Sequence, residues 1–486
     1  MKGFQSSWAW ALVFLFNSCA SPPKNGARSG DSTPRVVVLH VSDLHARIQG
    51  VPGYGPGYAR VAAKLDQAAE GWGDRTDILR IFGGDAMGKG SMICRESRER
   101  ACVPLLQPFG FQVGVLGNWE LKRSVQELRP LLRASGFPWI GTNLSVTSGQ
   151  APWMSSFRFQ GPKSGADWTL VGWTAAPTPG EIDFKKAGYR VTSQAGAVQI
   201  RDWVKSYSGR DLLWVTHSEL EDDQALMNSV CGQSAFRSLA VLRAHTHVSK
   251  RRSESSCGTP MMEAGAYGLA ISQLVFEQVQ SQWTLVSHEF LDVSDDAPEQ
   301  PQLRDAVAQL LAASPSGASD VVAEAKVLVS REGLAQWLSK AFVGVTRADI
   351  GIANLGAVKD PLQVGSISRE LLLSYILPYN DLLVGADVDR RLLERALCQA
   401  RKRTRDDFED NGSELFMTGA KLVDDPERGC RLEGVRGSSV KLAMPQFVAK
   451  RSARWLGLDL SRQVFAFGVD QNHAVLTALK KNRELP

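Results

Sequence analysis

Short apolar runs punctuate the first half of the chain, and each of them ends in a polar step. They cover residues 36–41, 78–82, 112–116, 212–215 and 239–242. Because these runs are short and rich in Val, Ile and Leu, they favour buried strands over helices. Between them, segments such as 58–70 and 124–134 place apolar side chains at helical spacing. The pattern predicts a mixed α/β (α+β) domain over residues 35–291.

The polar steps carry side chains that can bind metal ions. The first run leads into Asp43 and His45, whose spacing lets both side chains point to one side of an extended segment. The other runs deliver further ligands at their carboxyl ends, where ligand sites lie in open α/β sheets. The predicted ligands are Asp43, His45, Asp85, Asn118, His217, His245 and His247. Such a set suits two divalent ions of Zn, Mn or Fe that share one bridging carboxylate.

The blocks that contain these ligands resemble a known family in order, spacing and context. They read Asp43-Leu44-His45, Gly84-Asp85, Gly117-Asn118-Trp119-Glu120, His217 and Ala244-His245-Thr246-His247. They are similar to the motifs D-x-H, G-D, G-N-H-E, H and G-H-T-H of the calcineurin-like metallophosphoesterase superfamily, in particular its bacterial 5′-nucleotidase branch. The resemblance implies a four-layer αββα sandwich with a dimetal site. By motif, one ion would be held by Asp43, His45 and His247, the other by Asn118, His217 and His245, and both by Asp85.

The third block departs from the family at two positions. In the family, the His of G-N-H-E supports the leaving oxygen and an Asp three residues later orients it, whereas Trp119 and Lys122 stand there in this chain. No residue therefore matches the family's catalytic pair. Indole has one N–H donor and cannot transfer a proton near neutral pH. A general acid contributes roughly 10²–10⁴ in rate, so we expect altered leaving-group catalysis.

Two alternatives to a phosphoesterase with altered leaving-group catalysis stay open. The chain could be a weakly active or inactive relative that binds metal or ligand without turnover. It could also act like the thiosulfohydrolases of bacterial sulfur oxidation, a related branch that carries Trp in this motif and releases sulfate.

A break in composition precedes the second half of the chain. Residues 292–301 are acidic and contain Pro, and residues 314–317 hold Pro and Gly again, which predicts a linker with a helix over 292–325. Residues 326–486 resemble the C-terminal domain of 5′-nucleotidases, with a helix expected over 384–397.

That second resemblance implies a smaller α/β substrate-binding domain. Lys359 stands where the family has an Arg. The Lys ammonium group acts as a point charge, whereas an Arg guanidinium can donate two parallel hydrogen bonds. Tyr379 stands where a Phe stacks on the base, and Asp381 where an Asn holds the nucleoside. The family's second stacking aromatic is not recognisable near residues 451–458, where Trp455 is the nearest aromatic residue.

The N-terminus predicts export. Residues 1–19 read as a signal peptide, because one Lys precedes an apolar core that is too short to span a bilayer. They resemble a bacterial lipoprotein signal in which Cys19 is lipidated, although Phe16 stands where a small aliphatic residue is usual. Residues 20–34 are rich in Pro, Gly and Ser and predict a flexible tether. We expect a lipoprotein at the periplasmic face of a bacterial membrane, with plain secretion to the periplasm or beyond as the alternative.

The cysteine count agrees with export. Six of the seven cysteines remain once Cys19 is set aside, and an even number in an exported chain favours disulfides. Proximity in sequence suggests the pairs Cys94–Cys102, Cys231–Cys257 and Cys398–Cys430, among the many that six cysteines allow. Free buried thiols are the alternative.

Composition and charge change this picture little. With 43% apolar and 22% charged residues the chain is an ordinary globular protein, and a net charge of +5 over 486 residues indicates no nucleic-acid partner. We interpret His40, His288 and His473 as structural. The sequence predicts an exported metal-dependent hydrolase of nucleotide catabolism, whose substrate is a phosphate ester of a nucleotide or another small molecule. The oligomeric state stays open.

Overall fold

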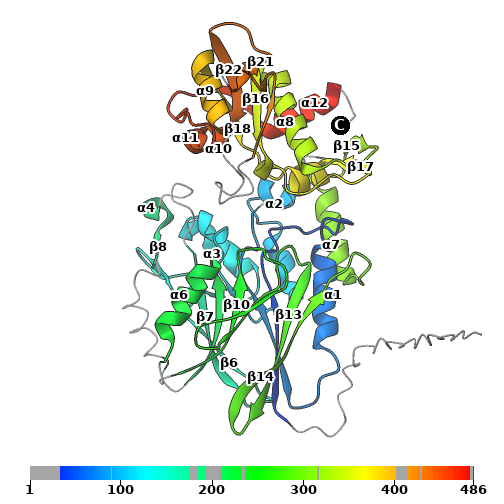
Figure 1. Ribbon diagram of the computed structural model, residues 1–486. Helices are drawn as coiled ribbons and strands as arrows, with labels where there is room; N and C mark the ends of the chain where they lie inside the picture. Colours follow the sequence, from blue (N-terminus) through cyan, green and yellow to red (C-terminus); the bar gives the residue numbers. More distant parts are fainter. Residues whose placement is uncertain are drawn as a thin grey trace, which may run out of the picture.

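The computed structural model describes residues 33–88, 90–175, 184–192, 207, 210–232, 236–314, 317–400, 414–426, 429–481 and 485. Its elements form a larger N-terminal part and a smaller C-terminal part, stacked one above the other (Figure 1). The predicted signal peptide and nearly all of the predicted tether lie outside the described residues.

Two six-stranded sheets form the centre of the N-terminal part. The first sheet contains, in spatial order, β14 (Gln282–Asp292), β13 (Ala270–Val279), β1 (Arg35–Val41), β2 (Thr76–Phe82), β3 (Val113–Val115) and β4 (Trp139–Ile140). The second contains β11 (Arg251–Glu254), β12 (Pro260–Glu263), β10 (Arg237–Ala244), β9 (Asp211–His217), β7 (Asp167–Thr174) and β6 (Phe157–Gln160). Strands β1 to β4 run parallel, as do β7, β9, β10 and β12. Their carboxyl ends therefore meet at one edge of each sheet.

Strand β1 shows why these runs are mostly apolar. Successive side chains of a strand point to opposite faces. Val37 and Leu39 pack toward the helices, whereas Val36 and Val38 pack between the two sheets, and all four are fully buried. A strand that is covered on both faces favours apolar residues at most positions instead of an alternating pattern.

Helices cover the outer faces of the two sheets. The first sheet packs against α1 (Gly57–Ala69), η1 (Val103–Phe109), α3 (Val125–Ala134) and α7 (Pro301–Ala312). The second sheet packs against α6 (Leu220–Val230). Shorter elements fill the connections: α2 (Met92–Glu96), η2 (Glu120–Lys122), β5 (Leu144–Val146), α4 (Phe184–Ala187) and β8 (Tyr189–Val191). The order helix, sheet, sheet, helix confirms the αββα sandwich.

The C-terminal part is built on a five-stranded sheet. Its strands are, in spatial order, β19 (Leu415–Thr418), β16 (Ile350–Asn354), β22 (Ser439–Pro445), β18 (Leu382–Asp389) and β23 (Phe465–Asp470). One apolar cluster joins it to α8 (Arg331–Thr346) and α12 (Gln471–Lys481), and another to α9 (Arg390–Ala400), α10 (Gln446–Lys450) and α11 (Ser452–Trp455). Smaller elements complete it: β15 (Val321–Ala325), η4 (Leu355–Ala357), β17 (Gly365–Ser368), η5 (Leu371–Ile376), β20 (Lys421–Val423) and β21 (Arg431–Glu433).

One expected helix of this part is wrong over its first half. We expected a helix over 384–397, but β18 continues to Asp389 and α9 begins only at Arg390. The physical reason is pairing with other strands, because β18 lies between β22 and β23 in the sheet. A strand between two others gains backbone hydrogen bonds on both edges, and these outweigh a weak local preference for helix.

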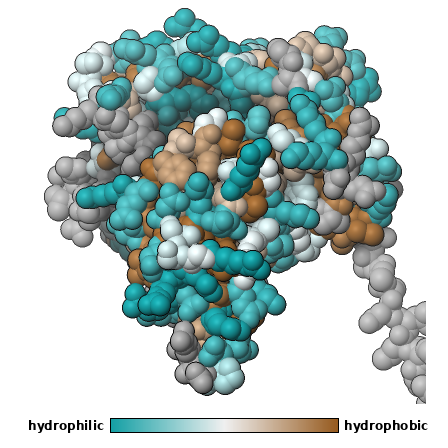
Figure 2. Space-filling view, turned by 90° about the horizontal axis from the view of Figure 1, so that it is seen from above, coloured by the Kyte–Doolittle hydropathy of each residue, from teal (hydrophilic) through white to brown (hydrophobic). Residues whose placement is uncertain are grey.

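The structure forms the three disulfides expected from proximity, Cys94–Cys102, Cys231–Cys257 and Cys398–Cys430. Among the described residues, we find no helix with the length and apolar character needed to cross a membrane. Seen from above, the surface is mostly hydrophilic, with apolar residues exposed among the polar ones (Figure 2). In the C-terminal part, Leu382, Phe447 and Phe465 are exposed apolar side chains.

Buried polar contacts join the two parts. The Arg47 guanidinium donates to the Asp360 carboxylate at 3.2 Å and lies 3.5 Å from the centre of the Tyr267 ring. The Tyr375 hydroxyl donates to the Gln49 carbonyl at 2.6 Å. Arg95 of α2 donates to the carbonyls of Leu373 and Pro378 at 2.7 and 2.9 Å. The loop that follows the first metal-binding block is therefore held against the C-terminal part.

Candidate metal centre

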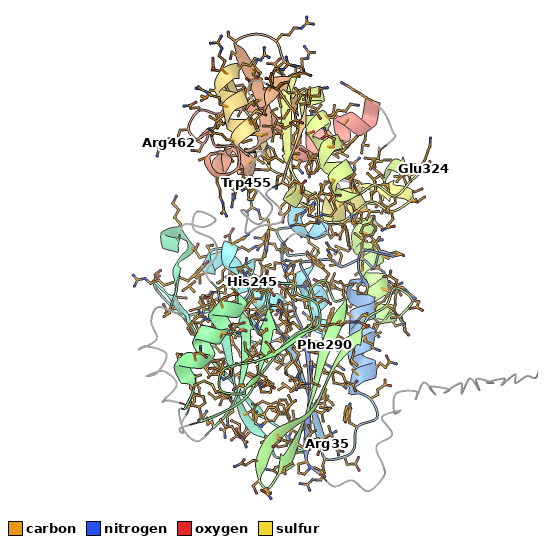
Figure 3. All side chains as sticks on the ribbon, in the orientation of Figure 1. Arg35, His245, Phe290, Glu324, Trp455 and Arg462 are labelled. Carbon is orange, nitrogen blue, oxygen red and sulfur yellow. A yellow bond between two sulfur atoms is a disulfide. The ribbon has the colours of Figure 1, made fainter. Side chains whose placement is uncertain are left out.

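All seven predicted ligands lie at the carboxyl-terminal edge of the two sheets. In the first sheet, β1, β2 and β3 lead into the first four, which are Asp43, His45, Asp85 and Asn118. In the second sheet, His217 is the last residue of β9, and His245 and His247 follow β10. The labelled His245 lies near the end of the sandwich that faces the C-terminal part (Figure 3). The fold thus collects residues from five separate segments at one place.

The first group of ligands is Asp43, His45 and His247. The Asp43 Oδ1 atom lies 3.3 Å from His247 Nε2 and 3.9 Å from His45 Nε2, and the two Nε2 atoms are 3.0 Å apart. One donor atom from each residue lies within 4.8 Å of the others, a spacing at which one ion can contact all three.

The second group contains the other four ligands. The Asp85 Oδ2 atom lies 3.3 Å from His217 Nε2 and 3.6 Å from His45 Nε2, so Asp85 stands between the two groups. The Asn118 Oδ1 atom lies 3.2 Å from His217 Nε2 and 3.1 Å from His245 Nδ1. Asp43 belongs to both clusters of candidate donor atoms, one with His45 and His247 and the other with Asp85 and His217.

The hydrogen-bond geometry of two histidines shows that this donor set fits cations. His45 Nδ1 faces the Met87 carbonyl at 3.3 Å, and His217 Nδ1 faces the Gly83 carbonyl at 2.8 Å. A carbonyl only accepts, so in each ring the Nδ1 atom carries the hydrogen. In the neutral rings, each Nε2 then presents a lone pair to the other ligand atoms. Only an added proton or a cation stabilises this arrangement, and a cation is the species the ligand set suits.

The charges of the site favour positive species in its centre. Burial alone would raise the pKa of the Asp43 carboxyl, but His217, His247 and His45 together lower it. Burial would likewise lower the pKa of His217, yet Asp85 and Asp43 raise it to about 10. Without a cation the His217 imidazole therefore holds a proton near neutral pH, which metal binding must release.

Five of the seven ligands have a left-handed backbone conformation: Asp43 (φ 52°), His45 (47°), Asp85 (56°), His245 (83°) and His247 (59°). Asp and His are among the residues that enter this region more readily, at a cost of roughly 1–2 kcal/mol per residue. Left-handed turns at the strand ends aim successive side chains into the site. Of the thirteen non-glycine residues with positive φ in the described part of the chain, these five are predicted ligands, and strained polar residues of this kind occur at functional sites.

A buried glutamate holds the first-sheet loops together. The Glu120 carboxylate accepts hydrogen bonds from the backbone N–H groups of Asp85, Met87 and Gly117 at 2.9, 3.2 and 2.8 Å. Burial, with a further contribution from the charge of Asp85, raises the pKa of Glu120 to about 7. A Cβ at Gly117 would collide with the Asp85 carboxylate, so only glycine allows this close approach.

A buried ion triad holds the second-sheet loops. Arg243 has no exposed surface, and its guanidinium donates to Asp223 of α6 at 2.6 Å and to Glu263 of β12 at 2.9 Å. Asp223 accepts from the Ser218 hydroxyl at 2.5 Å, and Glu263 accepts from the Thr246 hydroxyl at 2.7 Å. Ser218 follows His217, and Thr246 separates His245 from His247. The triad therefore ties the loops that carry three of the ligands to one guanidinium.

The two residues that depart from the family motif contact each other. The Lys122 ammonium lies 3.6 Å from the centre of the Trp119 ring, which is a cation–π contact. The Trp119 ring meets His45 edge-on at 6.0 Å between ring centres, and a Cβ at Gly88 would lie 2.7 Å from it. Trp119 thus forms a wall of the metal centre, close to Gly88.

Two of the predicted substrate-binding residues, Lys359 and Tyr379, contact each other in the C-terminal part. The Lys359 ammonium is 5.2 Å from the centre of the Tyr379 ring. Burial, with a contribution from the Tyr379 hydroxyl, raises the pKa of Tyr267 to about 12. The Tyr267 ring packs against those of His45 and His247 at 5.8 and 5.4 Å. Tyr267 therefore packs beside two of the predicted ligands.

Asp381 has a different environment. Its carboxylate accepts from the backbone N–H groups of Leu382 and Phe447 at 3.0 and 2.5 Å, at the start of α10. Trp455 is buried, and Phe447, 5.6 Å from it between ring centres, is the exposed aromatic ring beside Asp381. The contacts of Asp381 are those of a helix-stabilising residue.

Sequence reasoning missed four residues of this centre: Glu120, Glu219, Arg243 and Tyr267. Two of them left a signal in the sequence. Arg243 is a charged residue inside an apolar strand run, and Glu120 belongs to the third motif block. A buried charge needs a partner, so Arg243 indicated a buried carboxylate without telling which one. Glu219 and Tyr267 stand in ordinary loop contexts and left no comparable signal.

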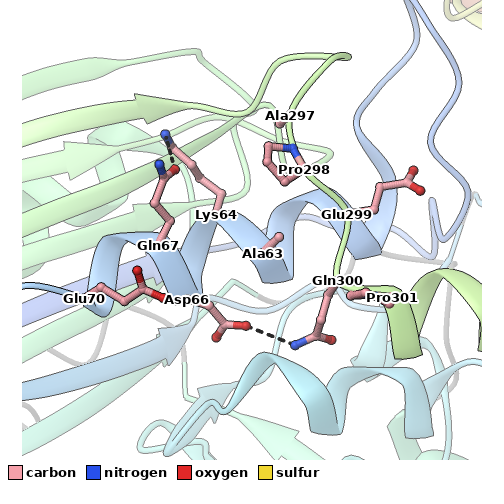
Figure 4. A pocket seen from close by; sticks show the side chains of 10 residues that line it. All are labelled: Ala63, Lys64, Asp66, Gln67, Glu70, Ala297, Pro298, Glu299, Gln300 and Pro301. Atoms are coloured by element: carbon pink, nitrogen blue, oxygen red, sulfur yellow. Dashed lines mark hydrogen bonds between the residues drawn. The ribbon is translucent and has the colours of Figure 1, made fainter.

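A pocket of about 320 Å³ lies elsewhere, between α1 and the segment that leads into α7 (Figure 4). Its lining includes Asp66, Glu70 and Glu299 but none of the predicted ligands. Asp66 already accepts hydrogen bonds from Arg80 and Gln300 at 2.8 and 3.1 Å. Its chemistry is separate from that of the metal centre.

Comparisons with known proteins identify the fold. No protein-family model and no curated protein sequence matches this chain. The 5′-nucleotidase precursor from Thermus thermophilus has a TM-score of 0.70 at 15% identity, covering 92% of this chain and 97% of that one. The 5′-nucleotidase from Candida albicans has a TM-score of 0.67 at 10% identity, covering 93% and 100%. The Thermus thermophilus sulfate thiohydrolase SoxB has a TM-score of 0.66 at 14% identity, covering 95% of each chain.

The fold and the site define a class of two-domain proteins with an αββα sandwich whose strand ends gather a candidate dimetal ligand set. The chain shares its two-domain fold with these solved 5′-nucleotidase structures. This confirms the fold class that the sequence motifs indicated.

Proposed function

We propose that the protein is a metal-dependent phosphoesterase that hydrolyses a phosphate ester of a nucleotide or another small molecule outside the cytoplasm. The observation that carries the proposal is the convergence of the predicted ligands from two sheets on one edge. The likeness to solved 5′-nucleotidase structures supports it.

The residues have distinct roles in this proposal. Two divalent ions would polarise the phosphoryl group and activate water near neutral pH. Asp85 would bridge the ions, and the other six ligands would divide as the motifs imply. Lys359 would attract the negatively charged substrate, and the Tyr379 ring offers a face for an apolar or aromatic group.

The leaving group would depart without a proton from the third block. The Trp119 ring has no transferable proton, and the Lys122 ammonium lies over the ring face. An ester with a poor leaving group gains most from a general acid, which contributes roughly 10²–10⁴ in rate. We therefore propose that the natural substrate has a good leaving group.

A second candidate is a sulfate-releasing thiosulfohydrolase. Two observations favour it: Trp119 in the third block, and the likeness to a sulfate thiohydrolase over nearly the whole of both chains. A thiolate is a better leaving group than an alkoxide and needs less acid assistance, because its conjugate acid has the lower pKa.

The test uses purified protein that is stripped of metal and reloaded with Mn²⁺, Zn²⁺ or Co²⁺. A panel of phosphomonoesters, with both nucleotides and activated esters, is assayed beside an S-sulfonated cysteine peptide. We expect metal-dependent phosphate release that Asp85→Asn abolishes. Sulfate release from the peptide alone would establish the second candidate. No release from any substrate, by protein shown to hold two ions, would identify a binding protein.

We also propose that the protein is exported and anchored by a lipid on Cys19. The support is the sequence of residues 1–34, nearly all of which lie outside the described part. Expression in a bacterial host with labelled palmitate should label the wild type and leave Cys19→Ala unlabelled. A wild type without label would leave secretion as the mode of export.

A further inference from the structure

The carboxylate of Glu219 lies on the far side of a ligand ring. Its Oε1 atom is 3.3 Å from His245 Nε2, whereas His245 Nδ1 lies 3.1 Å from Asn118 Oδ1. The two ring nitrogens therefore face two oxygen acceptors. A neutral imidazole has only one N–H group and cannot donate to both.

A bound cation would allow both ring nitrogens of His245 to make favourable contacts. If an ion lies between Nδ1 of His245 and the Asn118 oxygen, the lone pairs of both atoms bind it, and Nε2 carries the hydrogen. The Nε2–H group then donates to Glu219. Metal-binding histidines commonly donate their second ring N–H to a carboxylate, which fixes the tautomer and the ring orientation.

The backbone around Glu219 is rigid enough for this role. Glu219 is the residue before α6, and the Asp223 N–H donates to its carbonyl at 3.0 Å. Asp223 belongs to the buried ion pair with Arg243, and Cys231, just after α6, is joined to Cys257. Both ends of the helix are therefore fixed to the second sheet.

Glutamate is an unusual residue at position 219, directly before a helix. Ser, Thr, Asp and Asn are preferred before a helix, because their short side chains accept a backbone N–H of the first turn. The Glu219 side chain makes no such capping bond in α6. It reaches toward His245 instead, with 60% of its surface exposed.

We infer that Glu219 is a positioning residue, which holds His245 in the tautomer and orientation that bind the second metal ion. The inference rests on the proposed dimetal site and adds to it a residue outside the matched motifs. It assigns no proton transfer to Glu219. Its effect is on the affinity of one of the two ion sites.

The test measures metal affinity, which does not depend on turnover. Metal-free wild type, Glu219→Ala and Glu219→Gln are titrated with Mn²⁺ by isothermal titration calorimetry. Loss of such a carboxylate typically weakens metal binding by about 10–100-fold. We expect that loss at one site for Glu219→Ala, a smaller loss for Glu219→Gln, which keeps an acceptor oxygen, and an unchanged other site. The matched control is Glu221→Ala, which removes an exposed carboxylate two residues along the same helix.

Each outcome bears on the inference. Equal affinities for Glu219→Ala and Glu221→Ala would overturn it and leave the proposed function intact. A wild type that binds fewer than two ions would overturn both. A ¹⁵N spectrum of the imidazoles in the Zn²⁺-loaded protein provides a second readout, in which we expect hydrogen on Nε2 of His245 in the wild type. Hydrogen on its Nδ1 would contradict the inference.

Discussion

The Nε2 atoms of His45 and His247 lie 3.0 Å apart, although 202 residues separate them in the chain. His45 Nδ1 faces the Met87 carbonyl, so in the neutral ring its Nε2 presents a lone pair to His247. Asp43 Oδ1 is buried beside both rings. Two nitrogen atoms and a carboxylate in this arrangement are stable around a shared positive charge. The pair therefore belongs to the candidate metal centre.

Metal removal should lower stability through this pair. A ligand at a hundred times its dissociation constant stabilises a protein by about 2.7 kcal/mol. We expect Mn²⁺ to raise the unfolding temperature of chelator-treated wild type and to raise that of His247→Ala by much less, as measured by differential scanning calorimetry. His473→Ala, which changes an exposed histidine of α12, serves as the control. An equal Mn²⁺ effect in wild type and His247→Ala would contradict the assignment.

Restoring the family's pair at the third block should change the leaving-group dependence. In Trp119→His with Lys122→Asp, an imidazole with a carboxylate partner replaces the stacked indole and ammonium. We expect turnover to rise by about 10²-fold or more on alkyl phosphates, because a general acid assists poor leaving groups most. Nitrophenyl phosphate should respond much less.

Each single substitution serves as a control for that double variant. Trp119→His alone lacks the orienting carboxylate, and Lys122→Asp alone lacks the proton donor. Steady-state kinetics on both ester types, with metal content measured in each variant, gives the comparison. A gain of equal size on alkyl and nitrophenyl esters would show that the missing pair is not what limits the protein.

Breaking the buried triad should destabilise the fold. Arg243→Met leaves Asp223 and Glu263 without their buried partner, and loss of one member of a buried ion pair costs about 3–5 kcal/mol. We expect a fall of this size in the free energy of unfolding, measured by urea denaturation in chelator. Arg237→Met, on the same strand and paired with the partly exposed Asp211, should cost only about 0–1 kcal/mol. Similar losses of unfolding free energy in both variants would show that the buried triad stabilises the fold no more than a partly exposed ion pair does.

Acid should destabilise the protein through His40. Both ring nitrogens of His40 are buried and have no hydrogen-bond partner in the described part of the chain. Burial is the main cause that lowers its pKa to about 4. The unfolded chain takes up a proton near pH 6.5, before the folded chain does, so stability is lost as pH falls from about 6.5 toward 4. This loss amounts to about 3 kcal/mol.

The variant His40→Leu tests that contribution. Leucine has a similar volume and does not titrate, so the variant should lose less stability than the wild type between pH 7 and pH 4.5. Urea denaturation of metal-free protein at several pH values gives the comparison. Identical pH dependences would assign the acid sensitivity to other groups.

The strand ends and their ligands could be predicted because both are local features. An apolar run of a few residues followed by Asp-x-His or His-Thr-His is readable in a short window. The difference from the family motif at Trp119 and Lys122 is equally local. The span 384–397 shows the limit, because its first half becomes a strand through pairing with β22 and β23.

Alone, the sequence determined the class of fold, the seven candidate ligands and the altered third motif, since short-range patterns encode each of these. Only the tertiary structure decided which side chains support the ligands. Arg243 finds its carboxylates on α6 and β12, Glu219 meets His245, and Arg47 meets Asp360 of the other domain. Such contacts depend on how elements pack across long separations in the chain, and one residue's identity does not specify its partner.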